Sequence, residues 1–277
     1  MRWAVVAAAA GVLLLVAAAI ALTGAHTSVN EETLGLVYVH KRFPLDIISS
    51  VVNGLGLVAF AGAMVFLAGA VRARKADFTP LTSIAATAGA VLSALAGILL
   101  AIVLATKAQQ FVSHGAGTYQ EAHKVWTGPL VLAAQYAGLL GALLLAVAIV
   151  MTSLNAMRVG LLTRFMGYLG IFVAVLQMGF IPTPVPVVQA FWLCALAYLM
   201  SGRWPTGVPP SWRSGKPEPW PSSAQLREER IKAAAAGGPG GRGKPSAPPA
   251  PQAVGASAPV GRGTRAATPK RKRKRRK

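Results

Sequence analysis

The sequence predicts an all-α fold: a polytopic transmembrane bundle of six helices followed by a disordered basic C-terminal tail. Hydrophobic residues make up 54% of the chain and charged residues only 13%, and the mean hydropathy is +0.52. In a soluble domain about a quarter of the residues are charged. Apolar runs long enough to cross a bilayer recur through the first 202 residues, and the formal charge of +20 is concentrated at the other end.

Four apolar runs reach the ~20 residues that a helix needs to cross the ~30 Å hydrocarbon core, since each residue rises about 1.5 Å. None of the four contains Asp, Glu, Lys or Arg. They are residues 3–22, 47–71, 81–106 and 129–154.

Two shorter apolar runs follow, residues 165–181 and 185–200, with the sequence PTPVP between them. We predict that they are the fifth and sixth spans, joined by a turn that the prolines stiffen. A re-entrant hairpin is the alternative for segments this short. Both interpretations return the chain to the same side of the membrane.

The distribution of basic residues predicts the orientation. Arg2, the cluster at 72–75, the pair Arg158 and Arg164, and the C-terminal tail fall on one face, which the positive-inside rule makes cytoplasmic. In the opposite loops, 23–46 and 107–128, basic and acidic residues nearly cancel. We therefore expect a multi-pass protein of the cell (cytoplasmic) membrane with both termini in the cytoplasm.

The first run also fits a secretory signal peptide, because Arg2 precedes it and small residues close it. Its apolar core of about 20 residues exceeds the usual 7–15, which favours a retained helix. Cleavage would leave the rest of the topology unchanged.

We divide the chain into a bundle (1–202), a Trp/Pro-rich juxtamembrane segment with a short helix (203–236), and a Gly/Pro/Ala tether with a Lys/Arg-rich tip (237–277). Trp204, Trp212 and Trp220 recur every eight residues among prolines. They fit an interfacial aromatic belt or a docking strip for another protein. From residue 203 onward there are 18 basic and 3 acidic residues, and the tether composition predicts disorder.

No recognised catalytic motif is present, and no carboxylate lies in a predicted span, so we predict that the protein is not an enzyme and needs no cofactor. His114 and His123 with Glu121 offer metal-ligand types, but their spacing is not diagnostic and solvated loop histidines are the simpler interpretation. The single cysteine, Cys194, excludes an intrachain disulfide.

Small residues recur every fourth position in the third and fourth spans, which lets helix backbones approach closely. We therefore predict direct packing of these two spans. The stripes are Ala85, Gly89, Ser93, Gly97, Ala101 and Ala105, and Ala134, Gly138, Ala142 and Ala146. The bulky amides within the spans should face other helices and act as packing contacts. They are Asn53, Gln135, Gln177 and Gln189.

Residues 155–172 (NAMRVGLLTRFMGYLGIF), the segment PTPVPVVQAFWLCALAYLMSGRWPTGVPPSW and the terminal KRKRKRRK resemble a group of uncharacterised multi-pass membrane proteins of high-GC actinobacteria. The resemblance implies a bacterial cytoplasmic membrane and favours six helices. It implies no activity and no functional residues.

The favoured function is a non-enzymatic membrane protein whose cytoplasmic tail contacts anionic lipid or, as a second possible partner, nucleic acid. The contact residues would be Lys270, Arg271, Lys272, Arg273, Lys274, Arg275, Arg276 and Lys277. The alternative is a small-solute transporter in which Pro182, Pro184 and Pro186 interrupt helices near a binding site. A lipid-acting membrane enzyme ranks last, because no nucleophile, base or metal set is apparent.

Overall fold

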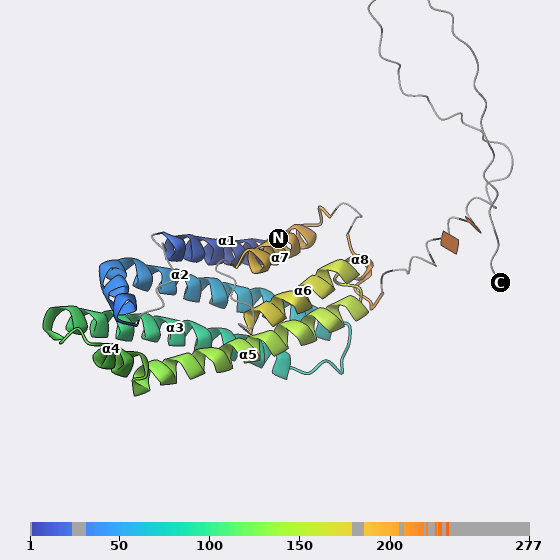
Figure 1. Cartoon of the computed structure of the whole chain (residues 1–277). Helices are drawn as coiled ribbons and strands as arrows, with labels where there is room; N and C mark the ends of the chain where they lie inside the picture. Colours follow the sequence, from blue (N-terminus) through green and yellow to red (C-terminus); the bar gives the residue numbers. More distant parts are fainter. Residues whose placement is uncertain are drawn as a thin grey trace, which may run out of the picture. The chain divides into compact units, whose positions relative to one another are not determined.

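The computed structural model describes residues 2–23, 32–178, 186–204, 208–218 and 220, together with residues 225, 227, 228, 231 and 232. These residues form helices and turns, with no strand among them (Figure 1). The helices with residue bounds are α1 (Arg2–Leu22), α2 (Glu32–Arg72), α3 (Leu81–His114), α4 (Tyr119–Trp126), α5 (Pro129–Arg158), α6 (Arg164–Gln177), α7 (Val187–Met200) and α8 (Pro210–Ser214).

Four helices, α1, α2, α3 and α5, are long and apolar enough to cross a membrane, judged by length and composition. They contain the four long runs of the sequence, so the all-helical fold and these four membrane-type helices are confirmed. Helices α6 and α7 have 14 residues each. A helix of that length rises about 21 Å, roughly two thirds of a hydrocarbon core.

Short polar and glycine signals set the ends of the later helices. Thr118 caps α4 by accepting a hydrogen bond from the backbone N–H of Glu121, and Thr163 caps α6 through Met166. Gly160 ends the turn after α5 with φ +78°, and Gly202 follows α7 with φ +77°. L-residues with a side chain rarely adopt this left-handed conformation, so glycine is favoured at both positions.

Helix α2 begins 15 residues earlier than its apolar run, at Glu32, and passes through Pro44. The longer helix forms because its first turns pack against the end of α3 and against α4. Trp126 on α4 donates its indole N–H to the carbonyl of Glu32 at 3.2 Å. A small apolar cluster, made of Leu36, Ala108, Phe111 and Ala122, fills the space between the three helices.

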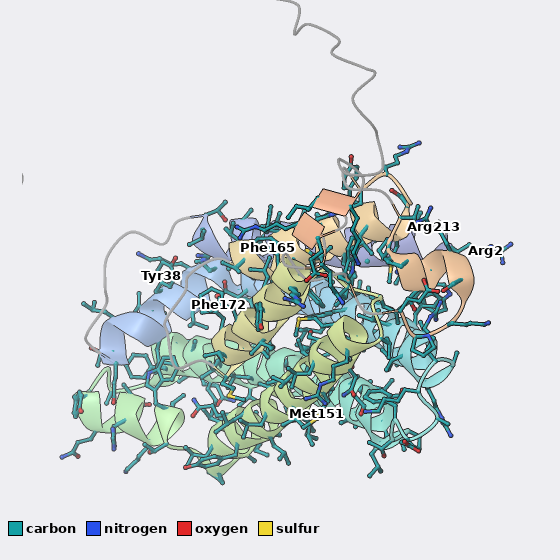
Figure 2. The ribbon with its side chains drawn as sticks, turned by 90° about the vertical axis from the view of Figure 1, so that its right-hand side faces the viewer. Arg2, Tyr38, Met151, Phe165, Phe172 and Arg213 are labelled. Carbon is teal, nitrogen blue, oxygen red and sulfur yellow. The ribbon has the colours of Figure 1, made fainter. Side chains whose placement is uncertain are left out.

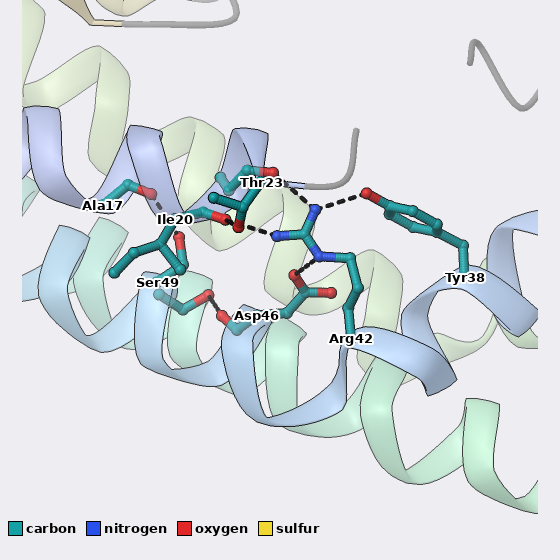
Figure 3. Close-up of polar contacts among 9 residues, drawn as sticks. Ala17, Ile20, Thr23, Tyr38, Arg42, Asp46 and Ser49 are labelled. Atoms are coloured by element: carbon teal, nitrogen blue, oxygen red, sulfur yellow. Dashed lines mark hydrogen bonds and ion pairs between the residues drawn. The ribbon is translucent and has the colours of Figure 1, made fainter. Parts of the chain in front are cut away.

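Helices α1 and α2 meet along a row of polar residues on α2 that satisfies the end of α1 (Figure 3). The guanidinium of Arg42, only 7% exposed, donates to the carbonyls of Ile20 and Ala21 at 2.7 and 2.8 Å. These carbonyls lie in the last turn of α1, where the regular i→i+4 donors run out. The carbonyl of Ile20 also accepts from the backbone N–H and the hydroxyl of Thr23. Asp46 pairs with Arg42 at 3.2 Å, and one turn further Ser49 donates to the carbonyl of Ala17.

The centre of the bundle is organised around Trp192 on α7. Its side chain is fully buried, and its indole N–H donates to the carbonyl of Met166 on α6 at 2.9 Å. The ring lies 5.9 Å from that of Phe60 on α2, at a tilt of 57°. Gly170 on α6 leaves the room for this indole and for Ser153 of α5, because a Cβ there would collide with both. One residue therefore links three helices.

Helices α3 and α5 approach each other most closely at two glycines. A Cβ on Gly141 of α5 would lie 2.7 Å from the backbone nitrogen of Ser93 and 2.8 Å from the carbonyl oxygen of Gly89 on α3. A Cβ on Gly89 would likewise lie 2.6 Å from the nitrogen of Leu145. Backbone atoms cannot rotate away as a side chain can, so both positions require glycine.

We predict that Gly141→Ala lowers the stability of the bundle in mild detergent by about 1–3 kcal/mol, the usual cost of inserting atoms into a filled contact. Gly97→Ala, on the facing helix, is the matched control, because a Cβ there meets no heavy atom within 4 Å. Thermal unfolding measures both. Equal stability of the two variants would contradict a close contact at Gly141.

Candidate functional site

One end of the bundle gathers most of the basic residues outside the tail, and we call it the basic end. There α1 begins, α2 ends, α5 ends, α6 begins and α7 ends. Stacking of Trp3 on Phe66 joins the start of α1 to the end of α2, and Lys75 donates to the amide oxygen of Asn155 on α5 at 3.0 Å. Its basic residues among those described are Arg2, Arg72, Arg74, Lys75, Arg158, Arg164, Arg203, Arg213 and Lys216.

A segment from the Trp/Pro-rich region, residues 208–218 and 220, packs against the basic end, and we call it the strap. Arg74 donates from Nε and Nη2 to the carbonyl of Ser211, at 3.1 and 2.8 Å. Two donors on one acceptor hold this carbonyl in place. Burial lowers the pKa of the Arg74 guanidinium, as expected for a cation drawn out of water by the segment above it.

Trp212 attaches the strap to the bundle. Its indole N–H donates to the carbonyl of Leu161, in the turn between α5 and α6, at 3.0 Å. Its ring stacks on Phe66 at 6.0 Å between centroids, and the Arg74 guanidinium lies 5.4 Å from the ring centroid. Cation–π contact and stacking therefore act on the same ring from two partners.

The strap continues past α8 along the end of α5. The backbone N–H of Glu218 donates to the carbonyl of Val159 at 3.2 Å, and Trp220 lies beside Arg158 and Arg164. The sequence suggested two interpretations of the three tryptophans, an interfacial belt or a docking strip for another protein. Neither interpretation included contact with the chain's own bundle. The sequence does not predict the contacts of Arg74 with Ser211 and Trp212. Arg74 and Ser211 are 137 positions apart, and no local pattern joins residues so distant.

Several cations at this end remain without a partner among the described residues. Two ion pairs form among the described residues, Arg42–Asp46 and His123–Glu32. Both lie at the opposite end of the bundle. Arg158 and Arg164 make neither an ion pair nor a hydrogen bond with a described residue. The chemistry available here is therefore the binding of anions through exposed guanidinium groups.

The predicted contact residues Lys270 to Lys277 lie outside the described residues, as does the tether before them. Pro182 and Pro184 also lie outside, whereas Pro186 precedes the first turn of α7. The predicted short helix is represented by residues 225, 227, 228, 231 and 232, which are helical.

The predicted packing residues occupy different environments. Gly89 and Ser93 lie against Gly141, which the stripe of the fourth span did not include. Gly138 would place a Cβ at an ordinary 3.6 Å from Ala96. Gly97, Gly138 and Ala142 line a cavity, and Ala101 lines another. The tightest point of the crossing is thus at Gly89 and Gly141, not at Gly97 and Gly138.

Amide side chains of the predicted spans gather in one place. Asn53, Gln135 and Gln177 line a cavity of about 390 Å³ between α2, α3, α5 and α6. Gln189 on α7 donates its amide to Gln177 at 2.5 Å. The sequence predicted that the four amides face other helices. The structure brings Asn53, Gln135 and Gln177 to a shared space, with Gln135 an exposed residue, and spacing along separate helices could not reveal this arrangement.

His114 and His123 have ordinary partners. His123 lies 3.1 Å from the Glu32 carboxylate and stacks on Tyr119, while His114 lies 2.6 Å from the Ser113 hydroxyl. The Glu121 carboxylate lies against Gly115 instead of either histidine. No group of three or more His, Cys, Asp or Glu residues among those described is placed to hold a metal ion.

Comparison of the chain with models of protein families, with curated proteins and with solved structures gives no match. The chain's own residues therefore provide the basis for a function.

We predict that Arg74→Gln releases the strap. Loss of its charge-assisted hydrogen bonds to Ser211 should raise the fraction of molecules in which the strap is detached from the bundle, on the order of tenfold. Limited trypsin digestion at Arg203, Arg213 and Lys216 measures this. Arg72→Gln is the control with the same charge change, because Arg72 is exposed and makes no hydrogen bond or ion pair with the described residues of the strap. Equal digestion rates for the two variants would contradict the role given to Arg74.

Proposed function

We propose that this protein is a non-enzymatic integral membrane protein that holds a basic C-terminal tail at the inner surface of the cell membrane, where the tail binds anionic lipid headgroups. The bundle serves as the anchor and the tail as the binding element. The proposal includes six helical segments, with α6 and α7 as a pair that enters from the basic end, and a cytoplasmic position for both termini.

The charge distribution supports this orientation. Among the described residues up to 220, the basic end has nine basic and two acidic residues, and the opposite end has four basic and three acidic residues. Positively charged segments stay on the cytoplasmic side during insertion. The basic end is therefore the expected cytoplasmic end, and the helix α4 with the start of α2 would face outward.

The strap is the observation that carries the proposal. Residues 211, 212 and 218 are each hydrogen-bonded to the basic end, so the chain that continues into the tail starts from this surface. The 32 tether residues from 238 to 269 would span about 30 Å as a flexible coil. The tip would thus remain within reach of the inner leaflet, whereas nucleic acid must arrive by diffusion. Each basic residue near an anionic surface contributes about 1 kcal/mol.

The first helix belongs to the anchor in this proposal. Its end is capped by Arg42, its start stacks on Phe66 through Trp3, and Gly11 faces Ala190, Leu193 and Cys194 of α7. Removal of α1 would leave Arg42 without its carbonyl partners and expose one face of α7. These contacts favour retention of α1 over cleavage as a signal peptide.

Reporter fusions test the orientation. A fusion after Arg74 and one after Arg203 should report a cytoplasmic position, and one after Thr118 should report the opposite side, because an odd number of spans separates Thr118 from each of the others. A cytoplasmic Thr118 fusion would overturn the topology.

Binding by the tail is tested on the full-length protein reconstituted without detergent in phosphatidylcholine nanodiscs, compared with a variant in which all eight residues from Lys270 to Lys277 are replaced by Gln. We expect the unchanged protein to bind phosphatidylglycerol vesicles at low salt and to release them near ~0.5 M salt, where the Debye length is well below the ~8 Å of physiological salt. Phosphatidylcholine vesicles are the control. Equal binding by the two proteins would overturn the role of the tail, and binding of RNA in preference to acidic vesicles would replace lipid by nucleic acid.

A small-solute permease is the second candidate, and the amide-lined cavity favours it. Asn53, Gln135 and Gln177 place donors and acceptors at membrane depth, as a binding site for a polar solute requires. Solute uptake by proteoliposomes that is lost in Gln177→Leu would support this candidate over a purely anchoring role.

A further inference from the structure

A cavity of about 480 Å³ opens at the basic end between the last turn of α5 and the first turns of α6. Its wall consists of Leu154, Met157, Arg158, Arg164, Tyr168 and, from the strap, Trp220. Two glycines create it. Gly160 turns the chain back after α5, and Gly167 lets Met157 pack directly against the backbone of α6, where a Cβ would collide with its sulfur. Arg158 and Arg164 are thereby placed on one cavity, six residues apart in sequence.

Every polar side chain in this wall can donate a hydrogen bond, and none has an acceptor among the described residues. Arg158 and Arg164 are exposed, and within the described part of the chain their side chains are unpaired and the Tyr168 hydroxyl makes no hydrogen bond. The indole nitrogen of Trp220 is enclosed and likewise has no partner among the residues that the structure describes. A buried N–H without an acceptor costs free energy, so this group points to an occupant that supplies one.

The nearby acid does not fulfil this role. Glu218, two residues before Trp220, is exposed, and its attachment to α5 is through its backbone N–H to Val159. Its carboxylate forms no ion pair with a described residue. Lys75, the neighbouring cation in the connection that follows α2, is bonded to Asn155 and does not line the cavity. The cavity is therefore cationic, with no compensating negative charge in its wall.

The apolar part of the wall distinguishes a lipid from a soluble anion. Leu154 and Met157 form the side of the cavity that leads along α5. Large apolar side chains continue from it in the same direction, with Met151 46% exposed on α5 and Phe172 47% exposed on α6. Figure 2 shows these two residues, and Phe165 nearer the turn, on the face formed by the neighbouring helices α5 and α6. Acyl chains would lie against this face while a phosphate met the two guanidinium groups.

We propose that this cavity binds the phosphate-bearing headgroup of an anionic phospholipid, with Arg158 and Arg164 on the phosphate, Tyr168 and Trp220 as further donors, and the acyl chains along α5 and α6. Basic pockets between membrane helices at the cytoplasmic side are suited to such headgroups. The planar guanidinium groups can each present two parallel donors to phosphate oxygens. The site depends on the proposed membrane embedding and is independent of the tail.

The test uses full-length protein in neutral detergent, titrated with phosphatidylglycerol or with phosphatidylcholine of the same acyl chains, and follows thermal stabilisation. We expect phosphatidylglycerol to stabilise the protein well above phosphatidylcholine. Arg158→Gln with Arg164→Gln should weaken this effect roughly 30-fold in apparent affinity, from two basic contacts at an anionic headgroup. The matched control is Arg213→Gln with Lys216→Gln, which removes the same charge from exposed positions of the same end that do not line the cavity.

Three outcomes would overturn the proposal. Equal weakening in the control pair would mean that general surface charge attracts the lipid. Inorganic phosphate that competes fully would mean a soluble-anion site, and loss of stabilisation on replacing the eight tail cations by Gln would assign the binding to the tail.

If the double Arg variant fails to fold, Tyr168→Phe provides the second test, since it removes one exposed donor and keeps the ring. It should weaken phosphatidylglycerol roughly fivefold and leave phosphatidylcholine unaffected. Unchanged phosphatidylglycerol affinity in Tyr168→Phe would contradict the role of Tyr168 as a donor and the headgroup position proposed beside it.

Discussion

Close backbone approach of α5 to its two neighbours is the constraint on which the rest of the bundle depends. Gly141 meets Gly89 and Ser93 of α3, and Gly167 accommodates Met157 of α5 on the other side. In a hydrocarbon surrounding, lipid tails are as apolar as Leu side chains, so helices associate through close packing and hydrogen bonds instead of burial from water. Contacts at glycine allow close packing and hydrogen bonding between helices. The turn at Gly160 ends α5 and sets the position of Asn155, Arg158 and the carbonyl that Trp212 contacts.

Polar interactions in this molecule serve mainly to complete backbone groups at helix ends and turns. Arg42 satisfies the last carbonyls of α1, Trp212 the carbonyl of Leu161, and Arg74 that of Ser211. Each is a long or aromatic side chain from a distant element that adds a donor to a carbonyl at a helix end or turn. The carbonyls of Ile20 and Ser211 also accept local hydrogen bonds, from Thr23 and Gly215. Such hydrogen bonds occur at both ends of the bundle. The middle is packed with apolar side chains around Trp192, and the amide-lined cavity is a polar exception.

The basic end combines two kinds of cation, and the difference between them is functional in our proposals. Arg74 and Lys75 are committed to internal contacts and hold the strap and α5 in place. Arg158 and Arg164 have no internal partner and face a cavity with further unsatisfied donors. In our proposals, a headgroup site on the bundle and a polybasic tip complement each other, because the first gives geometry and the second gives long-range, salt-sensitive attraction.

The sequence by itself determined the fold class and the four long apolar helices, because length, hydropathy and the absence of charge are properties of a contiguous segment. It also identified Gly89 as a contact residue. It did not identify Gly141, since the fourth-position spacing from Ala134 selects Gly138 and Ala142 on a neighbouring line of the helix. Likewise it could not extend α2 to Glu32, because the partners that stabilise those turns, Trp126 and Phe111, come from other helices.

Only the tertiary structure decided which polar residues share a site. The positions of Arg158 and Arg164 relative to Trp220, of Arg74 relative to Ser211, and of Asn53 relative to Gln177 depend on helix crossings and on a turn at Gly160. Periodicity describes one helix at a time, so it shows which face a residue occupies and not what lies opposite. The sequence thus established that cations gather at one end of the molecule, and the packing of α5, α6 and the strap established which of them are paired and which are free.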